Sequence, residues 1–344
     1  MKKIAIAAAV AGAFSVNATA AEITTYFEQE YALGMTDTGG DTSFDTMGID
    51  QSGNNMLNWN YSDDLGNGLS LVGTYSMVIN GNNSRAATTN RNSAIGLKGD
   101  FGTITMGTHE AWTELGAILN DGWGAAWGNG GSTVKTTRVG RSSGGTGGFT
   151  NVIANSVQWA SNDMNGLSVV ALWGSGTDTA TATTDEEYTD LYLKYNMGGV
   201  KLHAGFASSS DYGGTQGNTM DGSFVGIGYD FGAIQLNAET TNVEVKQGST
   251  TWEVDGGHIN LIMPTADGRV VFNYASSGDQ KENNATVNNS DWSGYDIAYQ
   301  HNASANTMLY IKYAQQTEGQ SYNATATTNE DSFTNISAGI RFQY

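Results

Sequence analysis

The sequence predicts an all-β fold, a transmembrane antiparallel β-barrel of 16 strands with one long loop folded into its interior. Three observations support this prediction. Apolar and polar residues alternate along many segments, as they do in strands that separate an apolar from an aqueous environment. Short turns alternate with long polar loops, which is typical of the two ends of an outer-membrane barrel. Glycine is abundant, with 46 residues, whereas the chain has a single proline, a composition that suits many long strands joined by tight turns.

The first 20 residues are expected to be a secretory signal peptide, so that residues 21–344 would form the barrel domain. Lys2 and Lys3 make a basic start, residues 4–14 an apolar stretch, and residues 18–20 a cleavage site. Without the two lysines, 13 basic residues remain against 34 acidic ones. Such an acidic chain repels nucleic acid, so no nucleic-acid partner is expected. The absence of cysteine from the sequence excludes disulfides and thiolate metal sites.

The alternation assigns the strands in order along this domain. Two alternating runs meet at a tight turn over residues 100–102, and in the last strand Ile336, Ile340 and Phe342 share one face. The runs match the roughly 9–11 residues that a tilted strand needs to cross a bilayer. The strands are expected near residues 23–34, 53–63, 69–79, 91–99, 103–109, 151–161, 167–175, 187–197, 200–209, 222–231, 233–244, 252–263, 269–277, 292–301, 307–316 and 333–344.

Turn and loop signals separate these strands. Asn-Gly, Gly-Gly and Asp-Gly pairs at residues 67–68, 165–166, 198–199 and 267–268 predict tight hairpin turns. Long polar loops are expected near residues 80–90, 176–187, 210–222, 278–291 and 318–331. Aromatic residues gather towards the strand ends, as the aromatic girdles of a membrane barrel require.

One connection differs from the others, the segment of about residues 110–150. It is rich in glycine and shows little β patterning. A connection of this length usually argues against an assignment of elements, unless the loop itself has a function. We therefore expect this segment to fold back into the barrel and to narrow its bore.

Three segments resemble the general bacterial porins, the trimeric diffusion channels of Gram-negative outer membranes. Residues 94–107 are similar to the fourth and fifth strands of that family, residues 155–159 (Asn-Ser-Val-Gln-Trp) to its sixth, and residues 339–344 to its C-terminal strand. The resemblance implies a homotrimer in the cell outer membrane, in contact with lipid and lipopolysaccharide. It also implies that the outer-membrane assembly machinery reads the last strand, so Phe342 and Tyr344 are candidates for that assembly signal.

In that family, carboxylates on the inward loop face arginines on the opposite wall of the bore. Carried over by position, Asp121 matches the first loop carboxylate and Arg91 a wall arginine. Two family arginines are missing here, because Thr108 and Val152 stand at their positions. Other charged residues could replace the lost groups, namely the acidic Glu110 and Glu114 and the basic Lys135, Arg138 and Arg141. The resemblance thus predicts passive diffusion of small hydrophilic solutes, and the acidic chain predicts a mild preference for cations.

Patterns of catalytic and metal-binding residues argue against an enzyme. Residues 140–144 have the spacing of a nucleophile elbow, but no strand pattern precedes them and no helix pattern follows. The four histidines are His109, His203, His258 and His301, far apart on different expected strands, which does not suit a zinc site. We expect no catalytic residue, no metal and no cofactor, with a hydrolase site at the barrel rim as an alternative.

Two further alternatives come from other features. Trp112, Trp123 and Trp127 of the long loop could stack on sugars, which would make a substrate-specific channel, or could simply pack against the wall. A secreted soluble β-protein, such as a lectin or an adhesin, would show the same alternation. Acidic runs such as residues 185–187 are either solvated loop surfaces or sites for divalent cations shared with lipopolysaccharide phosphates.

Overall fold

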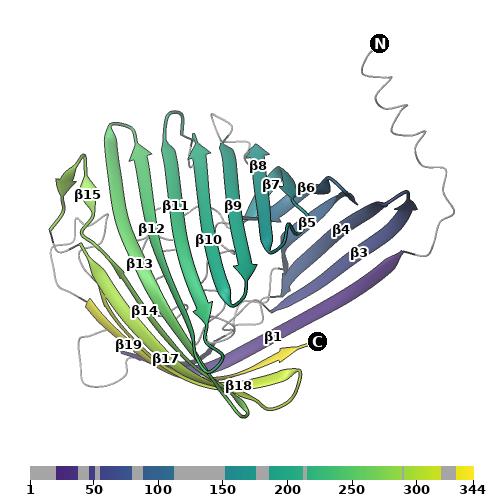
Figure 1. Cartoon of the computed structure of the whole chain (residues 1–344). Helices are drawn as coiled ribbons and strands as arrows, with labels where there is room; N and C mark the ends of the chain where they lie inside the picture. Colours follow the sequence, from purple (N-terminus) through teal and green to yellow (C-terminus); the bar gives the residue numbers. More distant parts are fainter. Residues whose placement is uncertain are drawn as a thin grey trace.

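The computed structural model describes residues 21–37, 46–50, 55–79, 88–111, 152–175, 186–211, 215–288, 290–318 and 331–344. The secondary-structure elements of these residues are strands, and all of them belong to one sheet (Figure 1). In this described part of the chain, no helix is long and apolar enough to cross a membrane. The expected signal peptide and most of the expected inward loop, residues 112–151, lie outside the described residues.

Sixteen long strands of the described chain pair antiparallel with their neighbours in sequence. They are β1 (Glu22–Asp37), β3 (Met56–Gly66), β4 (Leu69–Ile79), β5 (Thr88–Gly99), β6 (Gly102–Glu110), β7 (Val152–Ala160), β8 (Leu167–Ser175), β9 (Glu187–Met197), β10 (Val200–Ser210), β11 (Thr219–Asp230), β12 (Gln235–Gln247), β13 (Thr250–Thr265), β14 (Gly268–Ser277), β17 (Trp292–Asn302), β18 (Thr307–Glu318) and β19 (Asp331–Gln343). The short β2 (Thr46–Asp50) pairs with β1, and the small β15 (Lys281–Glu282) and β16 (Ala285–Thr286) hairpin adjoins β13.

The sheet closes on itself where β1 meets β19. Their register runs from Glu28 opposite Gln343 to Asp37 opposite Thr334. Phe27 and Tyr344 extend this pairing with two reciprocal backbone hydrogen bonds of 2.9 Å. Closure leaves the 16 barrel strands without a free edge, and the predicted 16-stranded barrel is confirmed.

Side-chain burial is inverted relative to a water-soluble protein. Along β11, Val225 and Ile227 are 61% and 58% exposed, and the residues of the same kind on neighbouring strands share their face of the sheet. The opposite face carries Asn237 and Asn260, both 0% exposed. A face of large exposed aliphatic side chains is stable only against hydrocarbon, so the outer wall meets lipid and the inner wall lines a polar bore. This arrangement rules out the soluble sandwich.

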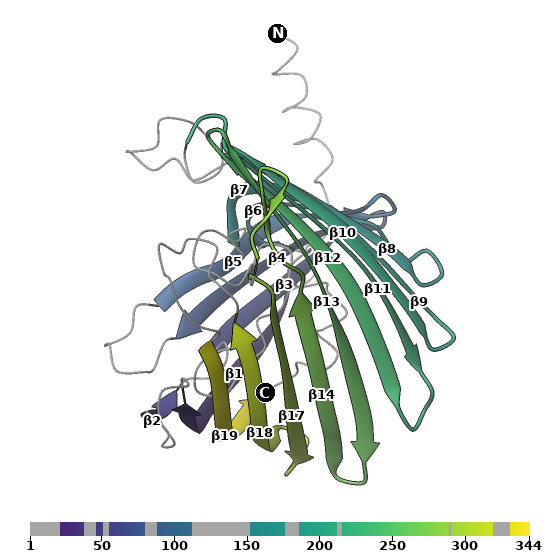
Figure 2. The same cartoon turned by 90° about the vertical axis from the view of Figure 1, so that its left-hand side faces the viewer.

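Tight turns close the hairpins at one end of the barrel, as Figure 1 shows for β9–β10, β11–β12 and β13–β14. Asn67 and Asn165 adopt positive φ angles of 53° and 58° and are followed by glycines with positive φ, which is the conformation that hairpin turns of this type need. At the other end β12 and β13 run further than expected, to Gln247 and from Thr250. Figure 2 shows β12 and β13 running side by side to the upper end of the barrel.

Candidate pore lining and loop root

The inner wall from β12 to β17 carries a row of three hydrogen-bonded amides that ends at a carboxylate. The Nδ2 of Asn237 donates to Asn260 (2.8 Å), that of Asn260 to Asn273 (2.6 Å), and that of Asn273 to Oδ1 of Asp296 (2.8 Å). These residues are direct register partners on β12, β13, β14 and β17, so the row runs across the strands. We call Asn237, Asn260, Asn273 and Asp296 the amide row. Each side chain forms a hydrogen bond with its neighbour, which makes the row compatible with burial.

The closure between β1 and β19 is reinforced on the same inner face. Arg341 on β19 places Nη2 3.1 Å from Oε2 of Glu28 on β1. The same carboxylate oxygen accepts a 2.6 Å hydrogen bond from the hydroxyl of Tyr26. Two residues further along β1, Glu30 accepts a 2.7 Å hydrogen bond from the hydroxyl of Tyr310 on β18. Charged and polar groups therefore link three strands across the seam.

Charge is distributed unevenly on this inner face. Five carboxylates that face the bore from the strands are buried, namely Glu28, Glu30, Asp190, Glu239 and Asp296. Lys194 and Lys201 on β9 and β10 are half-buried and Lys98 on β5 is exposed, and all three side chains point into the bore. Near the tight turns, Glu22, Asp64 and Asp230 are exposed acids of the described inner wall. The wall by itself thus does not present a surplus of negative charge to passing ions.

A second part of the inner wall is apolar. The residues concerned alternate with lipid-facing residues such as Leu191 and Phe206, so they point into the barrel, yet all are almost completely buried. We call this set the inner apolar patch. Its members are Ala111, Ile153, Val170, Leu172, Tyr188, Tyr192, Ala207, Met220, Phe224, Val243 and Val245.

The ends of β6 and β7 flank residues 112–151 in the sequence. His109 on β6 is 3% exposed, and its Nε2 lies 2.8 Å from Oγ1 of Thr105. Its Nδ1 lies 2.8 Å from Oγ of Ser156 on β7. The register shifts here, because Gly107 pairs with Ser156 but His109 pairs with Ile153. This side-chain cluster, missed by sequence reasoning, joins residues 47 positions apart.

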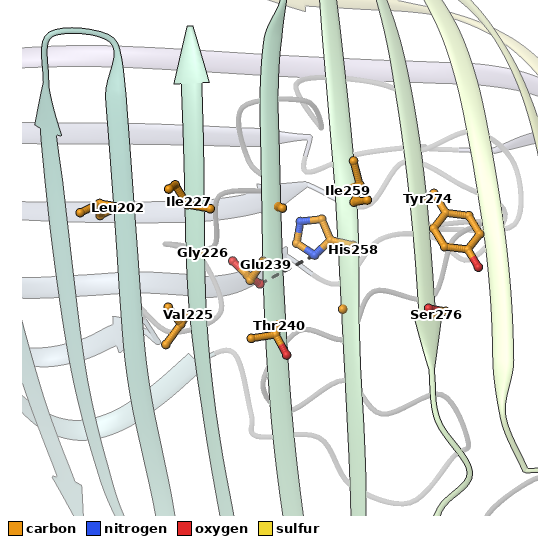
Figure 3. Close-up of a pocket in the computed structure, with 12 residues that line it drawn as sticks. Leu202, Val225, Gly226, Ile227, Glu239, Thr240, His258, Ile259, Tyr274 and Ser276 are labelled. Carbon is orange, nitrogen blue, oxygen red and sulfur yellow. Dashed lines mark ion pairs between the residues drawn. The ribbon is translucent and has the colours of Figure 1, made fainter.

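A hollow of about 650 Å³ lies elsewhere, on the lipid-facing side of β10–β14 (Figure 3). Its rim is formed by Leu202, Val225 and Ile227, large side chains of the outer face, and its shallow centre by small residues such as Ala238 and Gly257. Glu239 and His258 lie behind it on the inner face, with Oε1 and Nδ1 3.9 Å apart and the ion pair drawn dashed in Figure 3. The hollow opens to lipid, so it is not part of the bore.

The predicted constriction residues are only partly placed. Glu110 is the last residue of β6 and pairs with Val152, and strand alternation directs it away from the face of His109. Arg91 lies in β5 at a register irregularity, where Ser76 and Met77 pair with Asn92 and Asn90. The other five predicted constriction residues fall outside the described residues: Asp121, Glu114, Lys135, Arg138 and Arg141.

Phe342 and Tyr344, predicted as an assembly signal, both lie beside Phe27 of β1. The Phe342 ring centroid is 6.4 Å from that of Phe27, and Tyr344 is largely exposed. Among the described residues, no group of three or more histidine, aspartate or glutamate side chains is placed to hold a metal ion.

A closed sheet with an apolar outer face and a polar bore defines a membrane β-barrel of the channel-forming class. The chain belongs to the Gram-negative porin family, whose model matches residues 5–321. The predicted family is thereby confirmed. The protein is an outer-membrane porin, a channel and not an enzyme.

Solved porin structures share this fold at low sequence identity. An anion-selective porin from Comamonas acidovorans superposes with a TM-score of 0.75 at 19% identity, over 94% of this chain and 100% of that chain. The trimer form of OmpT from Vibrio cholerae gives 0.69 at 17% identity, covering 95% and 100%. OmpF of Salmonella typhi in complex with daunomycin gives 0.63 at 14%, covering 94% and 97%. No curated protein sequence matches this chain significantly.

Proposed function

We propose that this porin lets small hydrophilic solutes and ions diffuse passively through a bore that residues 112–151 narrow, with a mild preference for cations. The observation that carries the proposal is the inner apolar patch. Apolar side chains that face a water-filled bore would be exposed, and burying each of the larger ones against another segment stabilises the protein by about 1.5–3 kcal/mol. Their near-complete burial requires a covering segment.

Residues 112–151 are the natural cover. Ala111 immediately before this segment and Ile153 shortly after it are themselves members of the inner apolar patch. The segment therefore starts and finishes at the surface that has to be covered. Forty residues are long enough to cross the bore and return, since an extended chain spans up to about 3.3–3.6 Å per residue. On this proposal Asp121, Glu114, Lys135, Arg138 and Arg141 lie near the narrowest point.

The sign of ion selectivity depends on that segment, because the described wall does not present surplus negative charge. We base the cation preference on Asp121 and on the acidic balance of the chain, 13 basic against 34 acidic residues after the expected signal peptide. The porin from Comamonas acidovorans is described as anion-selective, and at 19% identity it supports the fold but not the sign of selectivity here.

A planar bilayer experiment tests the proposal. Under a KCl gradient the reversal potential should indicate a modest excess of cation over anion permeability, and the Asp121→Lys variant should shift it towards anions. An unchanged reversal potential in Asp121→Lys would place that residue off the permeation path. Saturable block by a sugar would instead support the substrate-specific channel.

The proposal includes a homotrimer, in line with the trimer form of the Vibrio cholerae relative. It also places lipid and lipopolysaccharide, bridged by divalent cations, against the outer wall, and assigns recognition by the assembly machinery to Phe342 and Tyr344. Unheated protein should migrate as a trimer in a denaturing gel, and single-trimer currents should close in three steps. Phe342→Ser should lower the yield of assembled trimer in cells while total synthesis stays the same.

A further inference from the structure

We infer that His109 is the positioning residue that clamps the two strand ends from which residues 112–151 leave the wall. The inference rests on the proposed function, because the clamp matters for permeation only if that segment narrows the bore. Its own evidence is the geometry of Thr105, Gly107, Ile153 and Ser156, all described residues.

The hydrogen bonds of the clamp fix the proton positions. The hydroxyl of Ser156 donates a hydrogen bond to the backbone carbonyl of Ile153, with Oγ 2.8 Å from that oxygen. The same Oγ lies 3.1 Å from the backbone carbonyl oxygen of Gly107. Its proton is therefore committed to a carbonyl, and its lone pair accepts from Nδ1–H of His109 at 2.8 Å. The Oγ1–H of Thr105 then donates to Nε2 at 2.8 Å. A neutral imidazole thus bridges β6 and β7 with both ring nitrogens satisfied.

The clamp sits on a β-bulge that redirects β7. Between the pairs Gly107–Ser156 and His109–Ile153, β6 has one intervening residue and β7 has two. The extra residue is accommodated by Asn155, whose φ is +48°. One extra residue moves the side chains of the following residues to the opposite face of the sheet. Ile153 therefore points inward and joins the inner apolar patch. Ser156 donates to the carbonyl of Ile153, the first residue beyond the bulge, and His109 holds Ser156 in place.

The backbone ladder between β6 and β7 is short at this end. Beyond the bulge only two residue pairs, His109–Ile153 and Glu110–Val152, connect β6 to β7 in the described chain. Such a short ladder opens readily, and loops joined to it inherit that motion. The hydrogen bond between His109 and Ser156 therefore makes a large share of the local connection, and the bond to Thr105, within β6, orients the imidazole for it. Losing them should let the departure points of residues 112–151 move relative to the wall.

The test combines a functional and a structural readout on His109→Ala. Open-channel current noise should rise about twofold, and hydrogen–deuterium exchange should accelerate in peptides spanning residues 102–111 and 152–160. His109→Gln, whose amide can both donate and accept, should restore both values towards wild type. His301→Ala, near the end of β17, is the matched control and should change neither the current noise nor the exchange rates.

Each outcome has a clear meaning. Wild-type noise in His109→Ala, with or without faster exchange, overturns the clamp as a positioning device. If His109→Ala does not assemble, Thr105→Val removes one hydrogen bond only and should give an intermediate rise in noise. A wild-type protein that fails to conduct overturns the proposed function, whereas exchange at the two strand ends still reports on the clamp.

Discussion

The amide row and the inner apolar patch, two regions of the inner wall, are stabilised by different interactions. Across β12, β13, β14 and β17 the amide row is polar, and its side chains hydrogen-bond to one another from strand to strand. From the end of β6 to β12 the inner apolar patch gains its stability from burial. Both regions are buried, so the comparison shows two ways of stabilising buried side chains on the inner wall: mutual hydrogen bonding in the amide row and apolar packing in the inner apolar patch.

Truncation in the inner apolar patch should have the largest effect on stability. Phe224→Ala removes a buried ring on β11 and should lower the unfolding free energy by about 3–5 kcal/mol. Phe206→Ala, on the lipid-facing side of neighbouring β10, is the control of the same residue type and should cost clearly less. Denaturant titration of the refolded protein measures both. Equal losses would mean that the patch is not covered, and would remove the main support for an inward segment.

Interruption of the amide row should have an intermediate effect. Asn260→Leu deletes the hydrogen bonds to Asn237 and Asn273 and leaves their polar atoms unsatisfied, a loss of about 1–3 kcal/mol. Conductance should stay near wild type, since this part of the wall keeps its shape. The exposed Asn196→Leu is the control. A clear change in single-channel conductance would show that the amide row itself borders the narrow part of the bore.

Removal of lysine charge from the bore should have the smallest effect. The double variant Lys194→Gln, Lys201→Gln should raise the cation-to-anion permeability ratio by roughly 1.5-fold. The change should shrink at high salt, because the Debye length falls from about 10 Å at 0.1 M to 3 Å at 1 M. Lys246→Gln, on the outer face of β12, should leave the ratio unchanged. An increase that persists undiminished at 1 M would point to a change of bore shape instead of charge.

The barrel was largely predictable from the sequence because its outer face meets lipid and its inner face lines a polar bore. The strands expected at 69–79, 167–175 and 187–197 coincide with β4, β8 and β9. The pattern failed at the far ends of β12 and β13, where polarity is reversed: Val243 and Val245 face inward, and Glu244 and Lys246 are exposed on the outer face. There it missed the last residues of β12 and the first residues of β13. It also assigned the β15–β16 hairpin to a loop.

The site was less predictable than the fold. Residues 169–173 read Val-Val-Ala-Leu-Trp, apolar on both faces, and this was the available sign that the inner wall of β8 is covered. The contact of His109 with Ser156 depends on a one-residue bulge, which alternation cannot locate. The positions of Asp121 and its companions came from resemblance alone and stay predictions.

The pairing of β1 with β19 has a consequence for aggregation. An open sheet with this outer face would offer unpaired backbone groups beside a continuous apolar surface, which is the combination that templates fibrils. Closure removes the unpaired groups while the apolar surface goes into lipid. Until Phe27 and Tyr344 join, the chain carries both hazards at once, so closure of this seam and burial of the outer face in lipid have to occur close together in time.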